Sequence, residues 1–127
     1  MSNLKLPTMS YDNLTKLSKG YEIKIAYATT IESYDDSPKR IVIRQHGNII
    51  AQVTPDIIVI DNCGYDSSTT ANRLRKIMHD NNLGYYVRIR DFEMRLYNDV
   101  HTEVTAAFRK ATFTKHGAAW CLQYSGL

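Results

Sequence analysis

The sequence predicts one α+β domain: an antiparallel sheet of about six strands backed by one main helix, with a short N-terminal helix. Several short runs of β-branched and aromatic residues are separated by turn-forming residues, which is typical of antiparallel strands. One longer segment, from about Ser68 to Asp80, instead repeats its apolar residues at helical spacing. The chain has 127 residues, 43% of them hydrophobic, which suits a single core, so residues 1–127 are expected to form one domain.

The first third of the chain is predicted to contain the short helix and one long strand. Ser10 is placed to cap a helix from Tyr11 to about Lys19, and Gly20 is placed to end it. Apolar residues then alternate strictly with others from Tyr21 to Ile31, which predicts a half-buried strand with its odd-numbered residues inward. The acidic, proline-containing segment Ser33–Lys39 is predicted to be a polar loop.

Three further strands are predicted before the main helix, at Arg40–Arg44, Ile49–Val53 and Ile57–Ile60. The short segment Gln45–Asn48 joins the first two of these strands, which predicts a hairpin. Glycine and asparagine both tolerate positive φ, so the sequence leaves two turns open, His46-Gly47 and Gly47-Asn48.

The main helix, Ser68–Asp80, is predicted to bury one stripe of side chains and to end at Asn81-Asn82 and Gly84. The residues of that stripe are Ala71, Leu74, Ile77 and Met78.

A second hairpin follows, and its register can be predicted. A two-residue turn at Asp91-Phe92 pairs Arg90 with Glu93 and places every aliphatic residue on one face. The other face then carries Tyr86, Arg88, Arg90, Arg95 and Tyr97. A last strand is predicted at about Phe108–Phe113, and the tail Gly117–Leu127 is expected to dock on the body through Trp120, because aromatic side chains bury a large apolar area.

Composition and motifs argue against several function classes. The net charge of +3 permits an anionic partner but is far below that of a dedicated DNA-binding arm. No apolar run approaches the ~20 residues that span a bilayer, and the N-terminus lacks the apolar stretch of a signal peptide, so a cytoplasmic protein without membrane contact is expected. Neither a P-loop nor a G-x-S-x-G motif occurs, and we expect no enzyme and no cofactor.

No metal site is expected either, because the four histidines never fall at metal-ligand spacing. Cys63 and Cys121 are the only cysteines and are expected to be reduced thiols. Cys63 precedes a helix start, where a thiol pKa can fall, but no histidine is marked as its base. A structural thiol is therefore the favoured interpretation.

Two places are candidates for ligand binding. The first is the start of the main helix, where free N–H groups, Thr69, Thr70, Arg73 and Arg75 suit a phosphate or carboxylate. The alternative is an ordinary capped helix with a solvated basic face, in which Arg73 bonds to the sheet. The second candidate is the polar face of the second hairpin, whose rings and guanidinium groups suit single-stranded nucleic acid. The alternative there is a plain solvent face with an Arg90–Glu93 pair.

Three segments in order, Arg44–Ala51, Gly64–Leu74 and Val87–Phe92, resemble a widespread group of small bacteriophage-encoded domains of unknown function. The marks of that group are an R-x-H-x-x-x-I strand, a G-[WY]-x-[ST]-x-T-T-x-x-R-[LI] helix start and a hairpin ending in aromatics. The resemblance covers about residues 21–115 and implies a viral accessory protein with no assigned catalytic residues. Tyr65 stands where the group often has Trp and Arg75 where it often has Asn, which makes this helix more basic than usual.

The sequence thus predicts a small, non-enzymatic, phage-type binding protein that acts on host or phage machinery through a basic aromatic surface, with nucleic acid or another phosphate-bearing ligand as its target. One alternative is an anti-defence inhibitor that occludes a host protein or sequesters a nucleotide signal. Pure protein–protein inhibition would need an apolar anchor, for which Phe92 and Trp120 are the candidates. The sequence leaves the oligomeric state and the identity of the ligand open.

Overall fold

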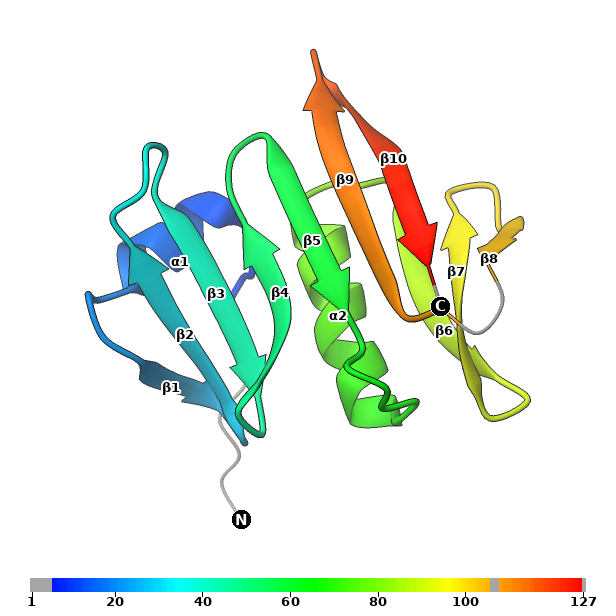
Figure 1. The fold of residues 1–127 in the computed structure, drawn as a ribbon, viewed down its shortest axis with the longest axis horizontal. Helices are drawn as coiled ribbons and strands as arrows, with labels where there is room; N and C mark the ends of the chain where they lie inside the picture. Colours follow the sequence, from blue (N-terminus) through cyan, green and yellow to red (C-terminus); the bar gives the residue numbers. More distant parts are fainter. Residues whose placement is uncertain (1–5, 106–107, 127) are drawn as a thin grey trace.

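The computed structural model describes residues 6–105 and 108–126, with side chains up to residue 123. This part of the chain forms an α+β fold of two helices and ten strands (Figure 1). A seven-stranded antiparallel sheet has the order β1-β2-β3-β4-β5-β9-β10, and a separate three-stranded sheet has the order β6-β7-β8. The elements are α1 (Tyr11–Leu17), β1 (Ile23–Ala26), β2 (Thr29–Tyr34), β3 (Arg40–Gln45), β4 (Asn48–Val53), β5 (Ile57–Asp61), α2 (Ser68–Asp80), β6 (Tyr85–Arg90), β7 (Glu93–Asn98), β8 (Glu103–Thr105), β9 (Lys110–His116) and β10 (Ala119–Gly126).

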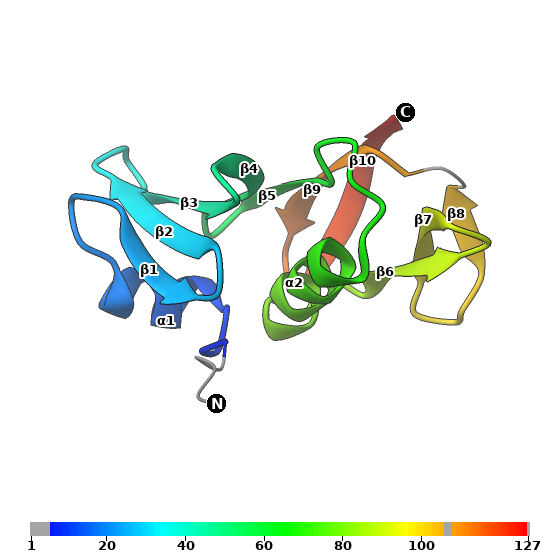
Figure 2. The ribbon, with the colours of Figure 1, turned by 90° about the horizontal axis from the view of Figure 1, so that it is seen from below.

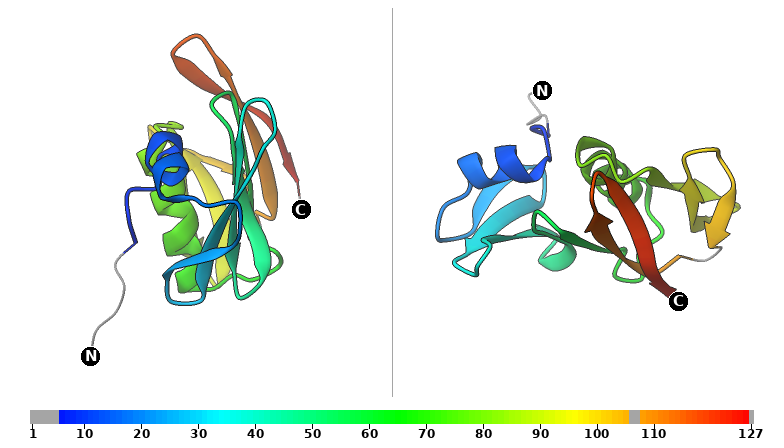
Figure 3. Two further views of the ribbon diagram at one scale, coloured as in Figure 1. Left: turned by 90° about the vertical axis from the view of Figure 1, so that its left-hand side faces the viewer. Right: turned by 90° about the horizontal axis from the view of Figure 1, so that it is seen from above.

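Both helices pack against the same face of the seven-stranded sheet, α1 under β1 to β3 and α2 further along, beside β4 and β6 (Figures 2 and 3). The small sheet flanks α2 on the side away from α1 (Figure 2). The prediction of one sheet of about six strands was therefore too simple. Chain 85–105 forms its own sheet beside α2 rather than extending the large one.

The prediction of a single strand from Tyr21 to Ile31 was wrong. The chain instead forms a hairpin, in which β1 and β2 are joined by a two-residue turn at Tyr27-Ala28 with Ala28 at φ 51°. A two-residue turn on its own shifts the alternation by one residue, as in the pair Ala26 and Thr29, but a register shift between Lys24 and Ala26 shifts it back, so that Ile23 lies opposite Ile31. The odd-numbered apolar pattern therefore continues through the turn, and the sequence cannot separate one strand from two. Tyr21 and Tyr27 were expected to point inward and are 61% and 66% exposed.

The other boundaries in this region shift by a few residues. Ser10 caps α1 as predicted, accepting a hydrogen bond from the N–H of Asn13, but the helix ends at Leu17, ahead of Gly20. β2 continues to Tyr34 and shortens the polar loop. The β3–β4 turn is His46-Gly47, both with positive φ, which settles the choice that the sequence left open.

The main helix is confirmed at Ser68–Asp80. The side chain of Ser67 caps it by accepting from the N–H of Thr70, and the predicted stripe of Ala71, Leu74, Ile77 and Met78 is buried. These side chains join one core cluster that contains strand residues such as Ile43, Ile60 and Phe113. Packing of this stripe fixes which residues of α2 remain available to a ligand.

The second hairpin has the predicted register, with Arg90 opposite Glu93, Arg88 opposite Arg95 and Tyr86 opposite Tyr97. Its turn residues, Asp91 and Phe92, both adopt positive φ, the geometry of a tight hairpin turn, although the pair lacks glycine and asparagine.

The C-terminal part adds two strands that were not predicted. β8 pairs with β7, and the tail forms β10, which pairs with β9 at the edge of the large sheet. Trp120 is half-buried against the core, so the expected docking of the tail is confirmed. The last predicted strand begins at Lys110 rather than Phe108, because the N–H of Phe108 donates to the carbonyl of Met94 and ties this segment to β7.

Candidate functional site

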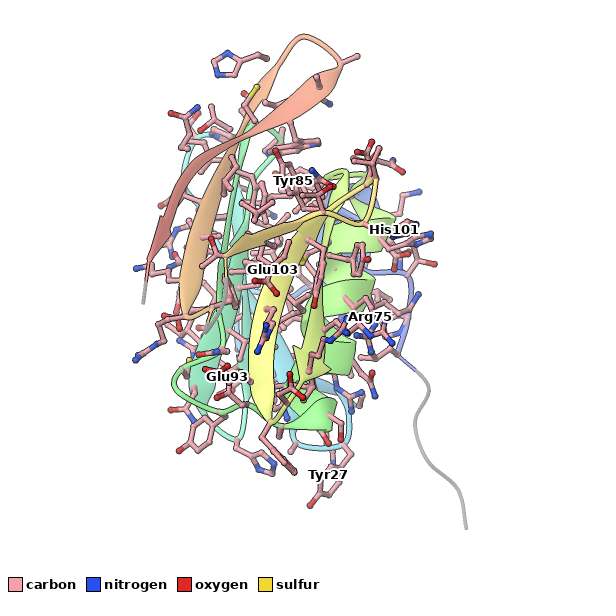
Figure 4. All side chains as sticks on the ribbon, turned by 90° about the vertical axis from the view of Figure 1, so that its right-hand side faces the viewer. Tyr27, Arg75, Tyr85, Glu93, His101 and Glu103 are labelled. Atoms are coloured by element: carbon pink, nitrogen blue, oxygen red, sulfur yellow. The ribbon has the colours of Figure 1, made fainter. Side chains whose placement is uncertain are left out.

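A groove runs between α2 and β6 and gathers three of the predicted site residues, Arg75, Tyr86 and Arg88. Its first part has a volume of about 410 Å³ and is also lined by Ser68, Ala71 and Ile89. A second hollow of about 510 Å³ shares Arg75 and Tyr86 and continues toward His101. The shared walls make these two hollows one feature, called here the α2–β6 groove. Arg75 and His101 lie on this side of the molecule in Figure 4.

Arg75 is held in the wall of the groove. Its Nη1 donates to the carbonyl oxygen of Val87 on β6 at 2.9 Å, and its Nη2 donates to Asn72 one turn back on α2. Neither partner is charged, so the guanidinium keeps its full positive charge while its orientation is fixed. Such a fixed cation loses little side-chain entropy when it meets an anion.

The two tyrosines of the hairpin have different surroundings. Their rings stack with centroids 5.3 Å apart and planes at 13°, but Tyr97 is only 7% exposed. Tyr86 is half-buried, and its hydroxyl lies 2.9 Å from Nδ1 of His101. Only Tyr86 can therefore offer part of its ring to a ligand, and the expectation that Tyr97 is exposed was wrong. The pairing of strands brings Tyr97 between β6 and β8, where it supports Tyr86 from behind.

The three hairpin arginines also differ. Arg88 and Arg90 are exposed and form no ion pair with any described residue. Arg95 lies among three carboxylates, those of Glu103 at 3.0 Å, Glu93 at 3.1 Å and Asp91 at 3.7 Å.

The hydrogen bond to Glu103 is the main reason that the pKa of Arg95 is raised, and the charge of this arginine is compensated locally. Sequence reasoning counted one glutamate on this face and missed Glu103, because β8 was not predicted. Figure 4 shows Glu93 and Glu103 on this side of the small sheet.

The start of α2 opens into a different hollow, the α2 N-terminal pocket, of about 330 Å³. Thr69 and Thr70 line it, as predicted for a ligand site at this helix start, but Thr70 is 4% exposed and is engaged by the Ser67 cap through both its N–H and its hydroxyl. The remaining lining residues come from the β3–β4 turn, from β4 and from the loop before α2: Gln45, His46, Asn48, Ile50, Tyr65 and Ser67.

Arg73 lines neither the α2–β6 groove nor the α2 N-terminal pocket. Its Nε donates to the hydroxyl of Thr29 at 3.0 Å, and its Nη2 is 3.5 Å from the carbonyl oxygen of Tyr27. Burial lowers the pKa of this arginine. These contacts fasten α2 to the β1–β2 turn, near Tyr27 in Figure 4, and they correspond to the structural alternative considered for Arg73.

The contacts of Cys63 are those of a structural thiol rather than of a nucleophile. Its Sγ donates to the carbonyl oxygen of Ile49 at 3.1 Å, and burial, reinforced by the neighbouring Asp61, raises the pKa of the thiol. A helix start can lower a thiol pKa, but here burial outweighs that effect. Cys63 and Cys121 are both free thiols.

The site residues that the sequence did not predict line the α2 N-terminal pocket. Gln45, His46 and Asn48 were assigned only to a hairpin, and Tyr65 only to the loop before a helix. The available signal was the resemblance itself, since its first two segments, Arg44–Ala51 and Gly64–Leu74, supply all eight lining residues.

The described residues contain neither a candidate metal cluster nor a candidate membrane helix. In that part of the chain, no three His, Cys, Asp or Glu side chains are grouped to hold a metal ion. No described helix has the length and apolar character needed to cross a bilayer.

Comparison with known proteins identifies the family of this chain. The family model described as Kyanoviridae Gp96 protein matches residues 6–118. Neither the curated proteins nor the solved structures contain a significant match. The matched stretch takes in both helices and β1 to β9, so it includes the groove and the pocket. The phage-encoded origin expected from the resemblance is thus confirmed, and the chain belongs to the Kyanoviridae Gp96 protein family.

Proposed function

We propose that this phage protein is a non-enzymatic binding protein that holds single-stranded nucleic acid in the α2–β6 groove. The observation that carries the proposal is the grouping of Arg75, Tyr86 and Arg88 around one hollow. Nonspecific binding of single strands needs cations for the phosphates and an aromatic ring for a base. The groove supplies two such cations and one such ring in the lining of a single hollow.

The distribution of charge favours one end of the groove. Arg75 and Arg88, with Ser68, line the end near the start of α2, and neither arginine is paired with a carboxylate in the described part of the chain. Asp99 lines the opposite end, beside His101. A phosphate is therefore attracted to the Arg75–Arg88 end, and a base adjoining it reaches the ring of Tyr86.

The expected affinity is modest. Stacking of one base on an aromatic ring contributes roughly 1–3 kcal/mol, and each phosphate contact with a single strand adds about 0.7 to the slope of log K against log salt. With Arg75, Arg88 and the neighbouring Arg90 as the cations, a total slope of about 2 is expected. The protein would act in this way on phage or host nucleic acid in the cytoplasm of the host cell.

The rival function, occlusion of a host protein, has one observation in its favour. Phe92 is 93% exposed at the tip of the β6–β7 turn, and an exposed aromatic side chain can anchor a partner. Trp120, the other candidate anchor, lies in β10 and is half-buried. β10 starts at the top of the view in Figure 1, whereas the β6–β7 turn lies at its lower right. The two side chains do not form one patch, so we favour the groove.

The test is binding of a fluorescent oligothymidine, about 20 nucleotides long, measured by anisotropy across a salt series. Arg88→Gln should weaken binding several-fold and reduce the salt slope by about 0.7. Lys24→Gln is the matched control, because Lys24 is also an exposed strand cation but lies on β1, far from the groove. Absence of binding by the wild type at low salt, or equal losses in the two variants, would contradict the proposal.

A further inference from the structure

We propose that the α2 N-terminal pocket is a binding site for a free mononucleotide, with the phosphate at the first turn of α2 and the edge of the base on the Gln45 amide. This site goes beyond the nucleic-acid groove proposed above. None of the groove residues lines it, and the two hollows meet only at the start of α2, where Ser68 faces the groove and Thr69 the pocket.

The first observation is the state of Gln45. Its side chain is 5% exposed and lines the pocket, yet its Oε1 is buried without a hydrogen-bond partner among the described residues. Its amide makes no side-chain hydrogen bond to any of the described groups around it. Buried polar side chains nearly always have a partner, and an unpaired one costs free energy. Oε1 is shielded from water in the free protein, so a ligand reaches it when the Gln45 side chain turns toward the pocket, where a ligand donor would remove that cost.

The second observation is the condition of the helix terminus. α2 has 13 residues, and its first turn contains no acidic side chain. Ser67 caps the N–H of Thr70, which leaves the N–H of Thr69 without a partner in the described part of the chain. Asp66, which directly precedes the cap, is held through its Oδ1, which accepts from Asn62 and from the N–H of Met94 on β7, and it does not line the pocket. No carboxylate therefore lines the pocket at the positive end of the helix dipole.

The walls between these two points suit a flat ring. His46 sits in the tight β3–β4 turn, and its ring packs edge-on against Tyr27 at 5.9 Å. Tyr65, which is 58% exposed, and the buried Ile50 also line the pocket. None of the lining residues is Lys, Arg, Asp or Glu. The volume of about 330 Å³ falls in the range of small-ligand sites.

These features together select the ligand class. Each nucleobase carries an N–H or NH₂ donor beside an acceptor, and a glutamine amide pairs with such an edge through Oε1 and Nε2 at once. A phosphate group satisfies the free N–H groups of the first turn. Inorganic phosphate satisfies only the helix terminus, and a nucleoside satisfies only the amide, so a nucleotide should bind more tightly than either fragment.

The experiment uses the full chain, labelled with ¹⁵N, titrated with AMP, GMP, CMP, UMP, the matching nucleosides and inorganic phosphate. At least one nucleotide should shift the amide signals of His46 and Thr69 and bind more tightly than its nucleoside or phosphate. Gln45→Met should weaken that nucleotide roughly tenfold, the loss of one well-made hydrogen bond, and leave phosphate binding unchanged. Gln123→Met, an exposed strand glutamine on β10, is the control and should change nothing.

A second variant keeps the test informative if Gln45→Met disturbs the fold. Thr69→Val keeps the size of a half-buried side chain and removes its hydroxyl from the pocket, and it should weaken nucleotide and phosphate alike. Arg88→Gln should leave nucleotide binding intact, which separates this proposal from the groove. Shifts confined to Arg75 and Arg88, unchanged affinity in Gln45→Met, or no shifts at millimolar ligand would overturn it.

Discussion

Replacing Gln45 with methionine should stabilise the protein in the absence of ligand. Methionine is unbranched and similar in size to glutamine, so it can occupy the same space without a new cavity. The substitution removes an acceptor that is buried and unpaired. A buried group without a hydrogen bond costs about 1–3 kcal/mol, and part of that cost is recovered when an apolar group replaces it. We expect a gain of about 1 kcal/mol in the free energy of unfolding, equivalent to about 3–5 °C in Tm for a chain of this size.

The backbone of Gln45 is not affected by this change. It pairs with Thr29 on β2 and with Asn48 across the β3–β4 turn through main-chain groups alone. The gain should therefore appear as a higher urea midpoint with an unchanged m-value, followed by circular dichroism. Gln123→Met should stay within about 0.5 kcal/mol of the wild type, as surface substitutions usually do.

A loss of more than about 1 kcal/mol in Gln45→Met would refute this reasoning, because it would show that the amide makes a stabilising bond in the free protein. The same result would remove the main support for the nucleotide site. The expected pattern is the opposite one, higher stability with weaker nucleotide binding, which is common where a binding site keeps a polar group ready for its ligand.

Three other predictions concern the frame around the two sites. Leu74 is fully buried on α2, so Leu74→Ala should cost about 2–5 kcal/mol in urea unfolding, and a loss below about 0.5 kcal/mol would place this helix face outside the core. Gly64 has φ +82°, and an added Cβ would meet only Nη1 of Arg109 at 3.9 Å, an ordinary contact, so Gly64→Val should lower the Tm through backbone strain, whereas Gly20→Val, at a glycine without positive φ, should cost less. Asp80 is partly buried, but hydrogen bonds from the N–H of Met9 and from Lys76 and His79 hold its pKa below the usual range. The contribution of the Asp80 carboxylate to the stability of the fold is therefore complete above the unfolded pKa of about 3.9 and is lost as the pH falls through the pKa of the folded state. Asp80→Asn should destabilise the protein near pH 7 and by less in strong acid, and an equal loss at both would disprove this role.

The sequence predicted best where local rules and burial agree. In α2 the apolar stripe and the terminating asparagines indicate the same segment, from about Ser68 to Asp80, and both were found in place. In the second hairpin only one register buries all of the aliphatic side chains, so the pairing was predictable despite an unusual turn.

The prediction failed where a decisive contact comes from a distant segment. The Tyr27-Ala28 turn has no glycine or asparagine to mark it, and Arg73 supports it from α2, 44 residues away from Thr29 in sequence. Arg95 was expected to be a free cation because Glu103 reaches it only through the β7–β8 pairing. Local patterns carry no information about either contact.

The start of α2 explains why sequence reasoning combined two sites into one surface. Successive residues of a helix point about 100° apart, so Ser68 and Thr69 reach different hollows although they are neighbours in sequence. The stripe that α2 buries lies against the large sheet, with the β3–β4 turn on one side of the helix and β6 on the other. Arginines and a half-buried tyrosine gather on the β6 side, whereas side chains without Lys, Arg, Asp or Glu and the helix terminus gather on the turn side. The first combination suits a charged chain with stacked bases and the second a single small ligand, so variants on one side should leave binding on the other unchanged.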